Sequence, residues 1–103
     1  MSVSDAGIQF ALELFEGLGP LTTRKMMGGL CLYSEGQIFA ILSSQGRLFL
    51  KAKGDFARAL TARGAVQFGM EGKTMGYWTL PEAALDDPEL ACDWARKALA
   101  ALE

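Results

Sequence analysis

The chain has 103 residues, of which 50% are hydrophobic and 21% are charged, and its formal net charge is −2. The length fits one domain, residues 1–103, and the composition fits a buried core, so a second core and intrinsic disorder are excluded. The charge balance excludes a uniformly basic nucleic-acid binder but allows a local basic patch. Histidine is absent, which excludes imidazole acid–base chemistry and His-ligated metals.

The first predicted element is a helix that begins at Ser4 and Asp5. A serine oxygen can accept an unpaired backbone N–H at a helix start, and a carboxylate suits the positive end of a helix. Hydrophobic residues then recur at helical spacing as far as Leu18, and Gly19 and Pro20 end the helix.

Three short strands are predicted next, at Leu30–Tyr33, Gln37–Leu42 and Arg47–Lys51. Each connecting segment is short and contains a glycine, which is typical of β-hairpin loops and indicates an antiparallel meander. Alternation puts Ala40 on one face and Phe39 on the other, so both faces are apolar. Sheets covered on one side are normally polar on the other. The second face is therefore expected to meet a ligand, a second copy of the chain, or further helices.

The rest of the chain alternates between helix and strand. A helix is predicted to begin at Gly54-Asp55 and to cover Phe56–Arg63, followed by a weak strand at Ala65–Phe68 and a turn at Glu71-Gly72-Lys73. A further strand is predicted at Met75–Leu80. Asp86-Asp87-Pro88 starts the last helix, which runs to about Leu102, because Asp caps helices and Pro suits their first position. The predicted fold class is α+β: a two-layer α/β sandwich with an antiparallel sheet of four or five strands and helices on one face.

Positive charge gathers in the middle of the chain. Residues 24–73 hold eight of the ten basic residues and three of the twelve acidic ones, whereas both ends are acidic. The basic middle region is either a site that attracts anions or a set of charged side chains in water along strand edges, where lysine also discourages edge-to-edge pairing.

The densest local cluster is Arg24-Lys25-Met26-Met27-Gly28-Gly29. Exposed amides of a glycine pair beside two cations could cradle a phosphate or carboxylate. The alternative is structural: the glycines form a tight entry to a strand and the methionines fill gaps in the core. Tyr77 and Trp78 point to opposite faces of a strand, so one is expected in the core and the other could stack on a partner or a base.

The two cysteines, Cys31 and Cys92, form no CxxC pair, so we expect small buried residues with reduced thiols and no metal site. The sequence shows no signal peptide and no apolar run long enough to span a membrane, which favours a cytoplasmic protein without a membrane partner.

Several motifs in order resemble the N-terminal domain of the TfoX competence regulators and its free-standing homologues. They are Arg24-Lys25-Met26-Met27-Gly28-Gly29, Gly36-Gln37-Ile38-Phe39-Ala40, Leu48-Phe49-Leu50-Lys51, Met75-Gly76-Tyr77-Trp78-Thr79-Leu80-Pro81, and Trp94-Ala95-Arg96-Lys97-Ala98 in the last helix. Met27 and Phe49 depart mildly from the family pattern. The resemblance implies a secretion-chaperone-like sandwich in a cytoplasmic bacterial protein connected with competence genes. It brings no catalytic residues and no cofactor, and because the chain ends at Glu103 we expect a free-standing copy.

The leading functional hypothesis is a non-enzymatic regulatory domain that acts through protein partners, including a second copy as a homodimer. The first alternative is an anion- or nucleic-acid-binding module that uses Arg24, Lys25, Lys51 and Lys53. The second is a small enzyme with an anion pocket at Gly28-Gly29, which lacks a nearby general base in the sequence. The predicted binding residues are Arg24, Lys25, Gly28, Gly29, Lys51 and Tyr77.

Overall fold

The computed structural model describes residues 3–26, 28–70 and 73–102. Its described part contains three α-helices, six strands and two short 3-10 turns. The helices are α1 (Asp5–Leu14), α2 (Gly54–Ala62) and α3 (Pro88–Ala101). The strands are β1 (Leu21–Met26), β2 (Gly29–Ser34), β3 (Gln37–Leu42), β4 (Leu48–Lys51), β5 (Gln67–Met70) and β6 (Lys73–Thr79), and the turns are η1 (Glu16–Leu18) and η2 (Glu82–Ala84).

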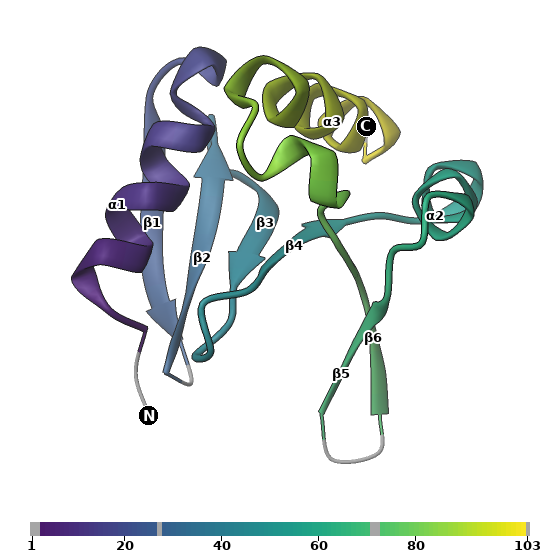
Figure 1. Cartoon of the computed structure of the whole chain (residues 1–103), viewed down its shortest axis with the longest axis horizontal. Helices are drawn as coiled ribbons and strands as arrows, with labels where there is room; N and C mark the ends of the chain where they lie inside the picture. Colours follow the sequence, from purple (N-terminus) through teal and green to yellow (C-terminus); the bar gives the residue numbers. More distant parts are fainter. Residues whose placement is uncertain (1–2, 27, 71–72, 103) are drawn as a thin grey trace.

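All strand pairs are antiparallel and form one open sheet in the order β1-β2-β3-β4-β6-β5 (Figure 1). The α+β class is confirmed, but the sheet has six strands instead of four or five. The strand that the sequence analysis missed is β1, in which only Leu21 is partly buried. An exposed edge strand shows no alternation of apolar and polar residues, so period-two analysis cannot detect it. The turn residues Glu71 and Gly72 lie outside the described residues.

The helix starts follow the predicted capping. Ser4 Oγ accepts the backbone N–H of Gly7 at 3.0 Å, and Asp87 Oδ1 accepts that of Leu90 at 3.2 Å. The first helix ends at Leu14, earlier than predicted, and the chain continues through η1. Gly19 then takes a φ of +94°, a backbone conformation that favours glycine, and releases the chain into β1.

One irregularity changes which way a large side chain points. Leu32 pairs with Ala40 and Tyr33 pairs with Ile38, so Phe39 is an extra residue in β3. At such a bulge two successive side chains lie on the same side. Phe39 therefore joins Ala40 in the core, where its ring meets Phe15 edge-on at 5.3 Å. The expectation from strict alternation, that Phe39 and Ala40 lie on opposite faces, was wrong.

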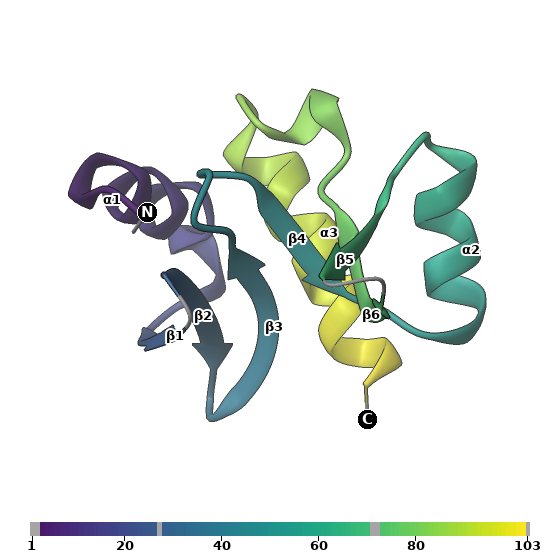
Figure 2. The same ribbon diagram turned by 90° about the horizontal axis from the view of Figure 1, so that it is seen from below.

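The core lies between the helices and one face of the sheet, which we call the inner face. Leu32, Ala40 and Leu50 follow one another across three strands on this face. They join the buried residues of α1, α2 and α3 in one cluster. In the two views α1, α3 and α2 lie along this face from β1 to the β5–β6 hairpin (Figures 1 and 2). In the described part of the chain no helix covers the other face.

Candidate functional site

The second face of the sheet, which we call the outer face, is largely apolar. Cys31, Ile41, Phe49 and Thr79 follow one another across β2, β3, β4 and β6. None of them belongs to the core cluster. Further residues of the outer face are Tyr33 and Ile38, which pair with each other, and Lys51 and Tyr77, which also pair. The outer face is thus a surface on which apolar and aromatic side chains gather without a helical cover.

The sheet is bent instead of flat (Figure 2). Three strand spacings from β2 to β6 amount to about 14 Å in a flat sheet. Even so, the pKa of Tyr77 in β6 is raised above 10.0, mainly by burial and further by the nearby Cys31 thiol and Tyr33 phenol of β2. Burial disfavours the phenolate, and anionic neighbours would repel it. Tyr77 is thus half-buried on the same face as Cys31 and Tyr33.

Phe49 lies near the middle of the outer face and has neighbours on it. The Phe68 ring from β5 packs edge-on against it, with centroids 4.8 Å apart. The Arg47 guanidinium lies 5.9 Å from the Phe49 ring centroid, a cation–π contact. Curvature and these neighbours leave Cys31 only 5% and Phe49 only 6% exposed.

The predicted cations do not share one face. Arg24 pairs with Cys31 and so lies on the outer face, whereas Lys25 pairs with Leu30 and lies on the inner face. Lys51 lies on the outer face beside Tyr77, and exposed Lys53 precedes α2. In the described part of the chain the ion pairs are Arg58–Asp55 and Arg96–Asp93, so these four cations have no carboxylate partner there.

The predicted glycines have structural explanations. Gly28 has a φ of +83°, and its carbonyl accepts the Val3 N–H at 2.7 Å. A Cβ on Gly29 would lie 2.5 Å from the Leu42 carbonyl oxygen, so only glycine fits beside β3. Met26, which the structural alternative placed in the core, is instead 49% exposed. Met27 of the same motif lies outside the described residues.

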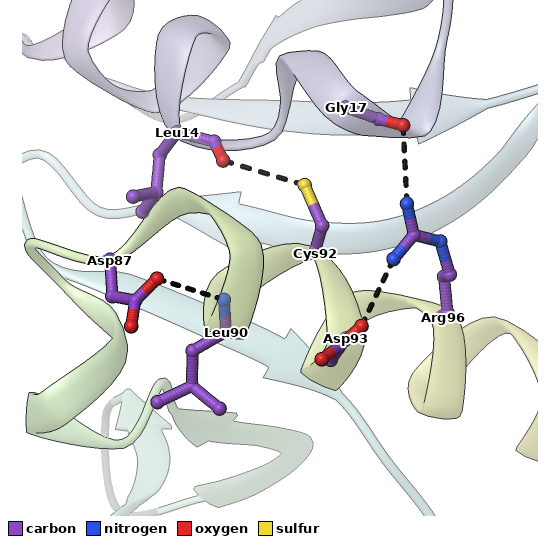
Figure 3. Close-up of polar contacts among 7 residues, drawn as sticks. All are labelled: Leu14, Gly17, Asp87, Leu90, Cys92, Asp93 and Arg96. Carbon is purple, nitrogen blue, oxygen red and sulfur yellow. Dashed lines mark hydrogen bonds and ion pairs between the residues drawn. The ribbon is translucent and has the colours of Figure 1, made fainter.

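Another group of polar contacts joins α3 to the end of α1. The Cys92 thiol donates to the Leu14 carbonyl at 3.6 Å, and Arg96 donates to the Gly17 carbonyl at 3.3 Å and pairs with Asp93 (Figure 3). A surface hollow of about 300 Å³ lies here; its lining residues are Gly17, Pro88, Glu89, Cys92, Asp93 and Arg96. Because these groups satisfy one another, we interpret this region as a structural junction. Both cysteines are buried, as predicted, and neither forms a disulfide in the described part of the chain.

No group of three or more Cys, Asp and Glu side chains in residues 3–26, 28–70 and 73–102 is placed to hold a metal ion. Within the same ranges, no helix combines the length and the apolar composition needed to cross a bilayer.

The family model described as the TfoX N-terminal domain matches residues 13–102. The chain belongs to the TfoX N-terminal domain family. A search of curated proteins finds no match. The matched TfoX N-terminal domain includes every strand of the sheet and both α2 and α3, so the outer face falls entirely within it. The chain is therefore a TfoX-like regulatory domain.

Part of the outer face of this TfoX-type domain could be predicted from the sequence. The apolar character of both faces of the meander was visible as alternation, and Tyr77 was correctly placed opposite Trp78, which packs against the core. Arg47 and Phe68 were not predicted as site residues. Phe68 reaches the face through pairing between distant strands, for which a single sequence carries no local signal. Arg47 comes two residues before Phe49, so alternation within the predicted strand Arg47–Lys51 could have placed it on this face.

Proposed function

We propose that this TfoX-like domain is non-enzymatic and works by binding a protein partner on the outer face. The observation that carries the proposal is a set of half-buried apolar and aromatic side chains on this face, Tyr33, Ile41 and Tyr77, that no helix covers in the described part of the chain. The exposed parts of these side chains favour association, because burying apolar surface is the main driving force of protein contacts.

The charges at the margin of this face specify the partner's chemistry. Arg24 and Lys51 lie on the same face as these apolar and aromatic side chains and have no ion pair in the described part of the chain. A partner surface with apolar side chains flanked by carboxylates is complementary to this arrangement. Following the family resemblance, we place this binding in the bacterial cytoplasm and connect it with the regulation of competence genes.

The proposal is tested by capture from extracts of the native cell with the whole chain and two charge-introducing variants. Ile41→Glu places a carboxylate in the middle of the outer face. Ala59→Glu, on the exposed side of α2, is the matched control. Binding of a partner that the wild type and Ala59→Glu both retain should be weakened about tenfold or more by Ile41→Glu. A tenfold loss corresponds to about 1.4 kcal/mol, and a central contact contributes about 2 kcal/mol or more.

Circular dichroism checks that each variant folds, and Tyr33→Ala provides a second, uncharged change on the same face. Equal capture by all variants would contradict the proposal. The nucleic-acid alternative is checked by fluorescence anisotropy with duplex DNA at low salt. Steeply salt-dependent binding that is lost in Arg24→Gln and Lys51→Gln would support that alternative instead.

A further inference from the structure

Strand β1 is an edge of the sheet with an open side. It pairs with β2 alone, and five of its six residues are exposed. Backbone N–H and C=O groups on an open edge are a template for another strand. Pro20 precedes β1 directly and has no N–H to donate, so it limits how far a pairing can extend in that direction.

Charge changes sign along this edge. A surface hollow of about 380 Å³ lies between α1 and the start of β1; its lining residues are Gln9, Leu12, Glu13, Glu16, Gly19 and Leu21. Glu13 and Glu16 have no ion pair in the described part of the chain. At the other end of the strand are Arg24 and Lys25. The edge is therefore acidic where β1 starts and basic where it ends, which is complementary to an antiparallel copy of itself.

Side-chain direction fixes the register of such a pairing. Residues directly opposite each other lie on the same face of a sheet, so odd-numbered residues of β1 must oppose odd-numbered ones. A two-fold axis at Arg24 would set two arginines opposite each other, which is destabilising. An axis at Thr22 would draw Pro20 into the ladder. An axis at Leu21 would do the same, and an axis at Lys25 would set two lysines opposite each other. The axis at Thr23 remains, with Lys25 opposite Leu21 and Arg24 opposite Thr22.

This register brings the opposite charges together. Leu21 and Lys25 both lie on the inner face, as their pairing across β2 with Ser34 and Leu30 shows. The partner subunit's Lys25, opposite Leu21, would then extend over the hollow that holds Glu13 and Glu16. Two-fold symmetry makes this contact twice. An edge lysine normally opposes strand pairing, but here each lysine would meet carboxylates.

We propose that a second copy of this chain pairs with β1 in this register and forms a two-fold dimer with a continuous sheet. This inference deepens the proposed function, on which it rests for the expectation that the domain works through protein contacts, and it assigns the self-contact to the edge instead of the outer face. Five residue pairs form a small interface, so dimerisation depends on protein concentration.

The test measures mass by light scattering over a concentration series for the whole chain. The wild type should dimerise, whereas Lys25→Glu and the double variant Glu13→Lys/Glu16→Lys should each be monomeric through like-charge repulsion. Mixing these two variants should restore a one-to-one dimer, because every Lys–Glu contact is then favourable again. Lys53→Glu, an exposed lysine away from the edge, is the control that stays dimeric.

Disulfide formation tests the register. Thr23→Cys should cross-link two chains on oxidation, because the two residues at the axis face each other. Lys25→Cys should not, because four residues of offset separate the pair by about 13 Å. A monomeric wild type, a dimeric Lys25→Glu or no restoration on mixing would overturn the inference. Partner capture that still depends on Ile41 would then leave the proposed function standing.

Discussion

At the scale of single residues, Gly29 shows how one position ties a sequence motif to the packing of the sheet. Its backbone runs so close to the Leu42 carbonyl of β3 that a side chain has no room. The close packing against β3 therefore explains why the motif has a glycine at position 29 without any role in binding anions.

We expect Gly29→Ala to lower the free energy of unfolding by about 1–3 kcal/mol, because the backbone of β3 must shift to admit a Cβ. The measurement is urea denaturation at equilibrium. Gly76→Ala is the matched control: its Cβ would lie 3.6 Å from the Ala52 carbonyl oxygen, an ordinary contact. Equal effects of the two substitutions would contradict this explanation of Gly29.

At the scale of elements, local signals define the helices, and pairing defines the strands. The start of α3 depends on Asp87, whose carboxylate accepts the Leu90 N–H, and on Pro88 at the first helical position. These interactions are contained within a few residues, so the sequence displays them. Strand β1 has no such local signal. It forms because its backbone pairs with that of β2.

Asp87→Ala should therefore destabilise the protein by about 1 kcal/mol through the loss of the α3 cap. Thermal unfolding followed by circular dichroism measures the change. Asp86→Ala, one residue earlier and also exposed, removes a carboxylate without removing the cap and should have little effect. If the two variants unfold alike, the cap is not the source of the stability.

At the scale of the whole molecule, the bend of the sheet and the packing of the helices on one side determine the shape of the outer face. Tyr77, Cys31 and Tyr33 come from strands that are three positions apart in the sheet, yet they influence one another. Because the helices cover only the inner face, the outer face and the β1 edge remain uncovered, and these are the two regions for which we propose contacts.

The titration of Tyr77 measures how far the outer face is shielded from water. In Tyr33→Phe the only remaining tyrosine is Tyr77, and burial should still hold its pKa above 10.0. The measurement is the ultraviolet absorbance of the phenolate. Above pH 10 the unfolded chain releases this proton before the folded one, so stability falls as pH rises through the native pKa. A midpoint at or below 10.0 would show that the outer face is open to water.

The sequence by itself determined the α+β class, the capped helices, the limits of β3 and the apolar character of both faces of the meander. These features depend on side-chain periodicity and capping, which operate over a few residues. Only the tertiary structure decided that β1 is a strand, that β4 pairs with β6 across α2, and that Arg24 and Lys25 lie on different faces. It also turned Phe39 into the core through a bulge. Such features arise from contacts between segments far apart in the chain, whose energies no local pattern records.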